Sequence, residues 1–416
     1  MLNFDEIHKR IYEKQSQLSE WHSKLRQSLP IPIYTSIDIR DSGFKIASVD
    51  ANIYPAGFNN ICDTDREAGH NLAKSYVEGT YGVDTKNIIL VTEEHTNNAY
   101  YWQNVYALRQ ILLEANYNVE IALPRKMDSI EVQTANGQVL KVHGSYTDEH
   151  GDLHLENGFK ADLVLTNNDF SDQLTEWASN LKTPLNPPRE MGWFQRKKST
   201  HFEFYNEFAG EFADILEVPK ESFQIFTEVF DDFDISDDTS KADLAKRVDE
   251  VLEDLSIKYK ELGIDSQPSV FVKNNSGTYG LAVNKVNSGN EILEWNYKSR
   301  KKMKAAKGGK DVSSLIIQEG IPSRIKVEDA VAEPVVYLMG CKLLGGFLRT
   351  HNKKGENDSL NSPGAVYKRL CMSDLLIHSE KAPMENVYGW IGRISSLAVG
   401  KEIQKAGVKF TTTECE

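Results

Sequence analysis

Residues 48–60 read SVDANIYPAGFNN, and this stretch decides how the fold of the whole chain is interpreted. Asp50 and Asn52 lie two positions apart, and a proline and a glycine follow them. Carboxylate and amide oxygens are ligands that Mg²⁺ accepts beside the phosphates of a nucleotide, so the stretch is a candidate metal turn. The alternative is a simple turn, in which Asp50 caps the backbone and the asparagines adopt left-handed conformations.

The composition is typical of a globular protein of two or three domains. The 416 residues exceed the size of one ordinary core, and 40% of them are hydrophobic and 26% charged. The net charge of −13 argues against a nucleic-acid surface, which needs a basic footprint. A small anionic ligand stays compatible with this charge, because a few local cations are enough to bind it.

The sequence contains no signal for a membrane or for disulfide bonds. No apolar run approaches the ~20 residues of a membrane span, and the first residues do not form a signal peptide. Cys62, Cys341, Cys371 and Cys415 are widely scattered and form no CxxC pair. We therefore expect incidental thiols in a reducing cytoplasm, with neither a disulfide nor a zinc site.

The first half of the chain predicts a layered α/β sheet. A helix is expected over residues 3–28, and buried strands over 87–92, 118–122 and 161–169. Between the first two strands, apolar residues recur at steps of three and four on one helix face: Tyr101, Val105, Leu108, Leu112 and Ala115. Such sheets bind ligands at the carboxyl ends of their strands. Residues 125–160 are expected to be an insertion of short hairpins.

A second α/β region is predicted to follow. We expect a helix over residues 202–216 and a solvated linker over the acidic stretch 229–240. A further helix has its apolar face from Leu244 to Leu262 and stops at Gly263, a residue type favoured just beyond helix ends. Strands then follow in quick succession, the last two forming a hairpin: 269–273, 313–318, 334–339 and 343–348.

The segment VFVKNNSGTYGLAV (270–283) is the first candidate for nucleotide binding. Lys273 ends a buried strand, from which its ammonium group can reach phosphates as a point charge. The loop that follows contains Gly277, Thr278 and Gly280, and small residues let backbone N–H groups approach phosphate oxygens. An ordinary β-hairpin would have the same pattern, so the segment by itself leaves both interpretations open.

The strand SLIIQEGIP (314–322) is the second candidate. Its end, with Gln318, Glu319 and Ile321, is suited to a hinge whose backbone groups bind an adenine edge while the acid accepts ribose hydroxyls. The alternative is an edge strand that turns at the glycine. The basic segment 296–311 before it is either a lid over the phosphates or a solvated loop.

The third candidate is GGFLRTHNKKGENDSLNSPGA (345–365). Arg349 on a strand is suited to stabilise charge that develops on a transferred phosphoryl group, and Asn361 to hold a metal or a phosphate. A surface loop rich in glycine, asparagine and lysine is the alternative. A lysine loop, a hinge and an arginine loop in this order are expected of an ATP-grasp fold, in which nucleotide lies between two α+β lobes.

The spacing R–x5–G–x5–N–x2–G from Arg349 to Gly364 resembles that of ATP-grasp carboxylate–amine ligases, such as ribosomal-protein glutamyl ligases and bacterial glutathione synthetases. Those families carry an acid-x-Asn metal motif on a later strand, which residues 365–416 lack. Eukaryotic-type glutathione synthetases, whose fold is circularly permuted, carry this motif early. The resemblance implies that Asp50 and Asn52 bind the metal and that the fold is a circularly permuted, ATP-grasp-like member of the α/β class.

More closely, the chain resembles the small proteobacterial family of glutamate–cysteine ligases. The resemblance runs from about residue 38 to 365 and is carried by these segments: 38–60, 93–105, 165–169, 196–202, 272–280, 316–322, 330–337 and 345–351. It implies ATP- and Mg²⁺-dependent joining of the side-chain carboxylate of L-glutamate to the amine of L-cysteine, the first step of glutathione synthesis. The alternative is another ligase of the same fold, such as a glutathione synthetase-like enzyme.

The resemblance also predicts a division into domains. Residues 1–195 are expected to form an N-terminal α/β substrate-binding domain that contributes the metal turn. Residues 196–416 are expected to form the ATP-grasp region, with a lid lobe around 240–320. Asp50 is then expected to lie beside the lysine loop and the arginine loop, both far away along the chain.

The stretch DIRDSGFK (38–45) supplies candidates for glutamate binding. A bound glutamate needs cations for its two carboxylates and an acceptor for its ammonium group. Arg40 and Lys45 are expected to supply the cations. Asp41, or alternatively Asp38, is expected to supply the acceptor.

Four further residues complete the candidate set. His95 and Asn98 fall after the strand 87–92 and at a helix N-terminus, a natural carboxylate site, although His95 has a turn role as its alternative. Lys198 stands with two other cations before a helix and is our candidate for an ATP contact, although no signal separates it from its neighbours. Glu333 is the third metal candidate, or else an acid at a strand edge.

Overall fold

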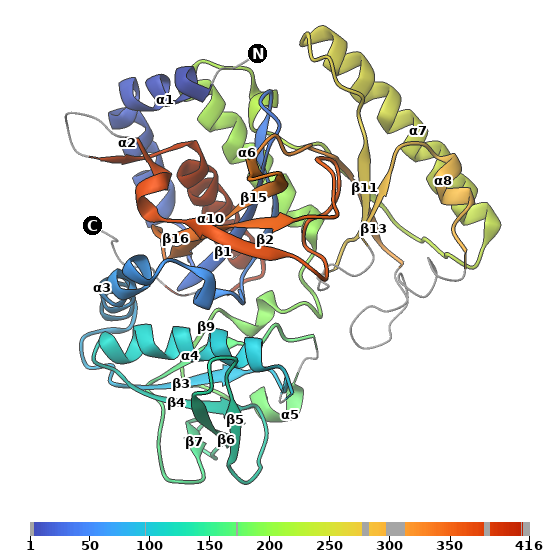
Figure 1. The fold of residues 1–416 in the computed structure, drawn as a ribbon. Helices are drawn as coiled ribbons and strands as arrows, with labels where there is room; N and C mark the ends of the chain where they lie inside the picture. The colour runs from blue at the N-terminus through green and yellow to red at the C-terminus, as the bar shows by residue number, and fades with distance from the viewer. Residues whose placement is uncertain are drawn as a thin grey trace.

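A computed structural model provides the fold. It describes residues 4–95, 97–171, 174–276, 283–296, 313–377, 383–408 and 410. Figure 1 shows a central body that contains α10 (Val387–Lys405), a layered unit below it, and a lobe to its right that carries α7 (Asp238–Glu261). The fold is mixed α/β, as the sequence predicts.

The central sheet combines strands from the two ends of the chain. Its order is β17-β16-β15-β1-β2, neighbouring strands are antiparallel, and β14 pairs with β15. The strands are β1 (Tyr34–Asp41), β2 (Ile46–Asn52), β14 (Lys326–Val327), β15 (Ala330–Met339), β16 (Lys342–His351) and β17 (Val366–Leu370). The predicted hairpin of the last two long strands, β15 and β16, is confirmed.

Strand β1 gives this sheet an apolar and a polar face. Ile37 and Ile39 belong to the hydrophobic core of the central body. Asp38 and Arg40 point to the opposite face, because successive side chains of a strand alternate. All four side chains are buried, so this polar face is enclosed and lies away from bulk water.

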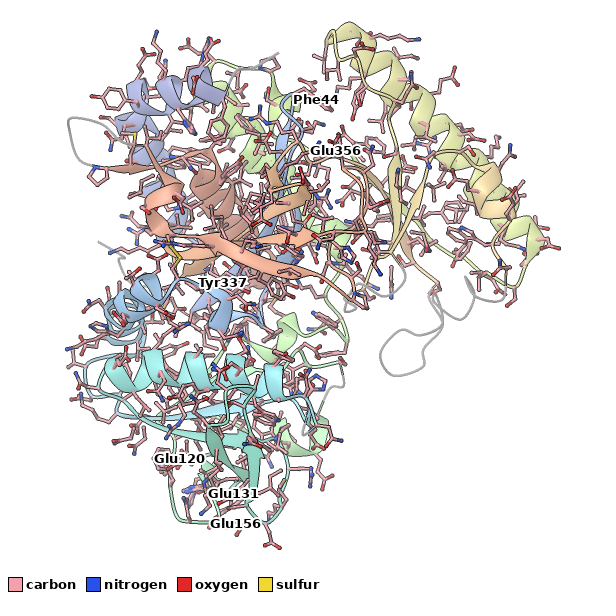
Figure 2. All side chains as sticks on the ribbon, viewed as in Figure 1. Phe44, Glu120, Glu131, Glu156, Tyr337 and Glu356 are labelled. Carbon is pink, nitrogen blue, oxygen red and sulfur yellow. A yellow bond between two sulfur atoms is a disulfide. The ribbon has the colours of Figure 1, made fainter. Side chains whose placement is uncertain are left out.

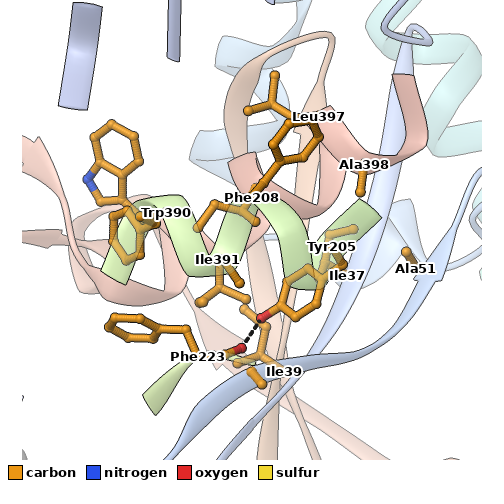
Figure 3. Packing of buried hydrophobic residues seen from close by; sticks show 14 of the residues in the cluster. Ile37, Ile39, Ala51, Tyr205, Phe208, Phe223, Trp390, Ile391, Leu397 and Ala398 are labelled. Carbon is orange, nitrogen blue, oxygen red and sulfur yellow. Dashed lines mark hydrogen bonds between the residues drawn. The ribbon is translucent and has the colours of Figure 1, made fainter. Parts of the chain in front are cut away.

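Helices α6 (Lys198–Leu216) and α10 cover the apolar face. Figure 3 shows Tyr205 of α6 and Ile391 of α10 packed around Ile37 and Ile39. Burial of each large apolar side chain of this kind contributes about 1.5–3 kcal/mol. The other elements of the central body are α1 (Phe4–Glu13), α2 (Gln15–Gln27), η3 (Lys220–Ser222), η4 (Met372–Leu375), β18 (Leu376–Ile377) and β19 (Met384–Glu385). Two helices, α1 and α2, therefore replace the single helix predicted over 3–28.

The unit below the central body is the layered sheet that the sequence predicts. Strands β3, β4 and β8 are parallel, with β3 in the middle, and the full order is β5-β6-β4-β3-β8-β9 with β7 beside β6. Its elements are β3 (Asn87–Thr92), β4 (Asn118–Leu123), β5 (Ile130–Gln133), β6 (Val139–Thr147), β7 (Leu153–Leu155), β8 (Leu163–Asn167), β9 (Leu185–Asn186), η1 (Phe58–Asn60), α3 (Asp63–Tyr81), α4 (Ala99–Glu114), α5 (Thr175–Ala178) and η2 (Arg189–Met191). The predicted strands, the helix between them and the hairpin insertion are confirmed.

The lobe to the right has its own sheet and core. The sheet order is β10-β13-β11-β12, and α7 packs against it with the short helix α8 (Asn290–Leu293). The strands are β10 (Thr227–Phe230), β11 (Val270–Asn274), β12 (Val283–Val286) and β13 (Leu315–Glu319). The helix ends where predicted, because Gly263 has φ +66°, a conformation that disfavours other residues.

The prediction of a solvated linker over 229–240 is wrong in part. Residues 229 and 230 end strand β10, and Phe233 and Ile235 are buried in the core of the lobe. α7 then begins at Asp238. The acidic residues around Phe233 and Ile235 indicate a solvated segment, and this charge pattern gives no sign that the two apolar side chains are buried.

A disulfide bond joins Cys62 to Cys371, across 309 residues of sequence, with their Cα atoms 5.6 Å apart. Figure 2 draws this bond in yellow, close to α3. The prediction that these two cysteines are incidental thiols is therefore wrong. Cys341 is buried, and Cys415 lies outside the described residues. Within the part of the chain that the structure describes, we find no helix with the length and apolar character needed to cross a membrane.

The disulfide predicts a redox-dependent stability. Disulfides that close long loops contribute about 2–4 kcal/mol, mainly by restricting the unfolded chain. We expect dithiothreitol to lower the urea unfolding midpoint of the protein. The double variant Cys62→Ser/Cys371→Ser is the control, and its midpoint is expected to match that of the reduced protein with or without dithiothreitol. Alkylation of both thiols in the unreduced protein would contradict the pairing.

Candidate active site

A cleft lies where the polar face of the central sheet meets the lobe. Its lining residues come from β1, β2 and β15 on one side and from β11 and β13 on the other. They are Asp38, Arg40, Val49, Asp50, Lys198, Phe271, Lys273, Val283, Gln318, Glu319, Ile321, Glu333, Ser359 and Asn361. The open volume is 70 Å³, which is room for a few water molecules. Paired charged side chains occupy much of the rest.

Strand β2 carries Asp50 into the cleft beside a β-bulge. Asp50 lies opposite Asp38 on β1, and the next pair is Ser48 with Ile39, so Val49 is the extra residue. A bulge leaves the extra residue unpaired in the ladder. The Val49 carbonyl instead accepts a hydrogen bond from Lys273 Nζ at 3.2 Å. The bulge thus ties the first part of the chain to the lysine strand of the lobe.

Cations surround the Asp50 carboxylate. Lys198 Nζ lies 2.5 Å from Asp50 Oδ1. Burial alone would raise the pKa of Asp50, but Lys198 and Lys273 outweigh it and hold the pKa below its usual range. Asp50 is therefore ionised at neutral pH. Burial lowers the pKa of Lys273 to about 8, although Asp50 opposes the shift.

Two acids and two arginines form a buried ion network at the floor of the cleft. Arg349 Nη1 lies 2.6 Å from Asp38 Oδ2 and 2.7 Å from Glu333 Oε1. Arg40 Nε lies 2.5 Å from Glu333 Oε2. The sheet dictates these contacts, because Glu333 and Arg349 are direct neighbours in the β15–β16 register. Burial raises the pKa of Asp38, while Arg349 opposes the shift.

Arg40 also fixes the loop that precedes Asn361. Its Nη2 donates to the carbonyl of Asp358 at 2.6 Å, and its Nη1 to the carbonyl of Glu356 at 3.1 Å. The same guanidinium therefore links an acid on β15 to the loop after β16. This loop brings Ser359 and Asn361 to the cleft.

The turn after β2 is held by amides of the layered unit. Asn104 Oδ1 accepts from the backbone N–H groups of Gly57 and Phe58, at 2.8 and 3.0 Å. Asn167 Nδ2 donates to the Pro55 carbonyl at 2.8 Å. Of the described residues in 48–60, positive φ occurs only at Gly57, so the alternative with left-handed asparagines is wrong.

The hinge residues contact neighbours that the sequence did not indicate. Gln318 Oε1 accepts from Lys273 Nζ at 2.6 Å, within the cleft. Glu319 is almost fully buried and pairs with Lys45 Nζ at 2.5 Å and with the Tyr259 hydroxyl at 2.8 Å. The Glu319 carboxylate therefore connects the lobe to the β1–β2 turn.

The structure gathers most of the predicted nucleotide and metal residues, together with the predicted substrate residue Arg40, around one cleft. Those that line it are Arg40, Asp50, Lys198, Lys273, Gln318, Glu319, Ile321, Glu333 and Asn361. Arg349 holds two of the lining acids, and Asn52 lies two residues beyond Asp50 at the end of β2. Asp50 thus lies beside the lysine strand and Asn361, as expected. Gly277, Thr278, Gly280 and the predicted lid lie outside the described residues, except for Asn296.

Four predicted substrate residues do not line this cleft. Asp41 pairs with Arg324 and accepts from the Tyr388 hydroxyl at 2.7 Å, and Lys45 pairs with Glu319. Asn98 caps α4 by accepting from the Tyr101 N–H at 3.1 Å, and the His95 ring lies 5.0 Å from the Tyr101 ring. Their assignment to glutamate stays a prediction.

Sequence reasoning gave no role to a second layer of charges behind Asp50. Arg196 Nη1 donates to the Ala51 carbonyl at 2.7 Å, and its Nε lies 2.8 Å from Glu402 Oε2. Glu402 comes from α10, in a part of the sequence without a recognisable motif. A pairing across 206 residues leaves no local pattern that would have found it.

Comparisons with known proteins identify relatives of the chain. The model of a family described as glutamate-cysteine ligase (GshA) matches residues 8–403. A crystal structure from Methylobacillus flagellatus KT, of a protein provisionally named gamma-glutamylcysteine synthetase, is 30% identical with a TM-score of 0.86. The alignment covers 96% of this chain and 95% of that one. A search of the curated proteins found no match.

Two other solved structures are similar only weakly. D-alanyl-alanine synthetase A from Vibrio cholerae O1 is 14% identical with a TM-score of 0.34, over 77% of this chain and 81% of that one. A glutathione synthetase-like effector from Globodera pallida is 13% identical with a TM-score of 0.39, over 89% and 84%. Scores of this size carry no argument about this chain.

The ion network predicts a large stability cost for removing its central cation. Arg349→Met leaves Asp38 and Glu333 buried without that cation, which costs about 3–5 kcal/mol in comparable buried pairs. The control is Arg247→Met on α7, where a more exposed ion pair with Glu228 is worth at most about 1 kcal/mol. We expect a much larger fall of the urea midpoint for Arg349→Met. Equal shifts in the two variants would contradict this account of the cleft.

Proposed function

Because the chain belongs to the glutamate–cysteine ligase family, it joins L-glutamate to L-cysteine, and we propose that the cleft is where it does so. One observation carries the proposal. Residues from three distant regions of the chain line a single cleft: Asp50, Lys273, Glu333 and Asn361. Two of the carboxylates are in close ion pairs, Asp50 with Lys198 and Glu333 with Arg40. The alternative, a glutathione synthetase-like enzyme, is not favoured, because the family match over residues 8–403 points to glutamate and cysteine.

ATP use follows from the family, and we place the nucleotide between the central sheet and the lobe. Lys198 and Lys273 are the cations suited to its phosphates. Phe271, Val283 and Ile321 supply apolar lining for the adenine ring. The open volume of 70 Å³ leaves little free space between the paired side chains, and we propose that the lobe moves away from the central sheet when the nucleotide binds.

We propose Mg²⁺ as the metal, held by Asp50, Asn52 and Glu333. All three offer oxygen ligands, the kind that Mg²⁺ requires, and Asp50 is ionised at neutral pH. When bound, Mg²⁺ supplies charge neutralisation at phosphate oxygens. A metal would compete with Lys198 for the Asp50 carboxylate. The lysine released in this way is then available to a phosphate.

The chemistry requires a carboxylate to become an electrophile. A γ-carboxylate oxygen of glutamate attacks the γ-phosphorus of ATP, and ADP leaves. The amine of cysteine then attacks the acyl carbon of γ-glutamyl phosphate, a proton leaves the nitrogen, and phosphate departs. The protein mainly positions the anions and offsets their repulsion. We assign Arg349 to the charge that develops on the transferred phosphoryl group and Asn361 to its orientation.

We further propose that the fold is a circularly permuted ATP-grasp. Support comes from β1 and β2, which complete a sheet whose other strands lie after residue 325. In this proposal residues 1–195 bind the substrates, 196–416 form the nucleotide region, and the lobe around 240–320 acts as the lid. A cytoplasmic location suits an enzyme of glutathione synthesis.

A substrate assay tests the function directly. The purified protein is incubated with ATP, Mg²⁺, L-glutamate and candidate amines, and release of ADP is followed. We expect release with glutamate plus cysteine. If ADP release instead requires γ-glutamylcysteine plus glycine, the chain is a glutathione synthetase-like enzyme.

Substitution of Asp50 tests the metal assignment. Asp50→Asn removes one ligand charge, and a metal contributes several kcal/mol to such reactions. We expect a fall in turnover of at least about 100-fold, which corresponds to about 3 kcal/mol. Asp152→Asn is the matched control, because its carboxylate pairs with Lys160 in a partly exposed position of the layered unit and is expected to keep full turnover. Full turnover of Asp50→Asn would refute the assignment.

The lowered pKa of Lys273 predicts pH-dependent nucleotide binding. The charged ammonium is present below a pKa of about 8 and is lost above it. Between pH 7 and pH 9 we expect calorimetry to show an approximately tenfold weaker affinity for a non-hydrolysable ATP analogue. Lys273→Arg keeps its charge over this range and is expected to flatten the profile. The same slope in both proteins would exclude Lys273 as the cause.

A further inference from the structure

Glu402 of α10 is a buried carboxylate with two cationic or polar partners. Its Oε2 accepts from Arg196 Nε at 2.8 Å and its Oε1 from Arg196 Nη2 at 3.0 Å, a two-pronged pair. His201 Nδ1 lies 2.7 Å from the same Oε1. Glu402 is only 4% exposed. Burial would raise its pKa, but Arg196 and His201 lower it to about 2, so the carboxylate is charged at neutral pH.

Arg196 links the Glu402 carboxylate to the strand that carries Asp50. Its remaining Nη1 donates to the Ala51 carbonyl at 2.7 Å, between the two proposed metal ligands. β2 is an edge strand, so its outward backbone groups lack partners from another strand. Side chains bind these groups instead. Arg196 and Lys273 donate to the carbonyls of Ala51 and Val49, and the Tyr205 hydroxyl accepts from the Ser48 N–H at 3.0 Å.

Glu402 is held in place because its helix, α10, is packed in the hydrophobic core. Trp390, Ile391, Leu397 and Ala398 of this helix are buried against α6 and the central sheet, as Figure 3 shows. α6 in turn begins at Lys198, the residue that forms an ion pair with Asp50. Glu402 therefore lies where the core helix, the start of α6 and the metal strand meet.

We propose that Glu402 is a positioning residue that orients the metal ligands of β2 through Arg196. Glu402 binds two of the three guanidinium nitrogens of Arg196, so the third reaches the Ala51 carbonyl and the guanidinium stays off the Asp50 carboxylate. Without Glu402, Arg196 is free to pair with Asp50 and compete with the metal. The inference rests on the proposed function, since it takes Asp50 as a metal ligand.

A second ion pair on the same helix provides a matched comparison. Glu385 forms a two-pronged pair with Arg393 of α10, with Nη2 to Oε1 at 2.7 Å. Glu385 is also largely buried, at 11% side-chain exposure. Neither residue is among those that line the cleft. Glu385→Gln therefore reproduces the chemical change of Glu402→Gln without its proposed consequence.

The test measures metal binding separately from turnover. Mn²⁺ serves as the probe, and its free concentration is followed by electron paramagnetic resonance in the presence of a non-hydrolysable ATP analogue. Glu402→Gln and Arg196→Lys are expected to weaken Mn²⁺ binding by about 10–100-fold, the usual loss when a residue behind metal ligands is changed. Glu385→Gln is expected to bind Mn²⁺ as the unchanged protein does. In turnover assays, the Mg²⁺ concentration at half-maximal rate is expected to rise, with most of kcat retained at saturating Mg²⁺.

Each outcome decides the proposal. Wild-type Mn²⁺ affinity in Glu402→Gln overturns it, and so does an equal loss in Glu402→Gln and Glu385→Gln. Should Glu402→Gln fail to fold, Arg196→Lys decides alone, because lysine keeps the charge but cannot bridge Glu402 and the Ala51 carbonyl together. Asp50→Asn distinguishes a failure of the proposed metal site from a failure of this inference. Unchanged Mn²⁺ binding in Asp50→Asn refutes the metal site and therefore the inference as well. Weakened binding there with no effect at Glu402 removes the inference alone.

Discussion

The antiparallel ladder between β1 and β15 is the constraint on which the rest of the structure depends. It pairs Asp38 with Val335 and Ile37 with Val336, so a strand near the start of the chain lies beside one near its end. Because side chains alternate along both strands, this register directs Asp38 and Glu333 to the same face. A slip of β1 by one residue would turn Asp38 toward the apolar face while Glu333 stayed on the polar one. The cleft exists only in this register.

Charge compensation explains how so many ionised groups remain buried together. Asp38 and Glu333 share Arg349, Glu333 also holds Arg40, and Asp50 holds Lys198. An isolated charge at these positions would cost several kcal/mol, whereas paired charges offset much of that cost. Pairs of this kind also suit an exchange, in which a phosphate takes the cations and a metal takes the carboxylates. The protein thus holds the charged groups of the cleft as ion pairs with one another.

The edge of β2 links the cleft to the core. An edge strand would ordinarily be satisfied by water or by a further strand, but here Tyr205, Lys273 and Arg196 bind its backbone. The lobe therefore contacts β2 through Lys273, and the core helix contacts it through Arg196 and Glu402.

Local patterns in the sequence were enough for most of the strands and helices, for Lys273 near a strand end and for the Asp50-x-Asn52 pair, because periodicity and turn chemistry depend on neighbouring residues. The resemblance to the ligase family identified the reaction for the same reason, since its motifs are continuous segments. Only the tertiary structure decided that Cys62 meets Cys371, that Lys45 neutralises Glu319 rather than lining the cleft, and that Glu402 anchors Arg196. Each of these residues is of a common type, and the residues next to it in sequence do not indicate its partner. The partner is decided by the packing of elements that lie hundreds of residues apart.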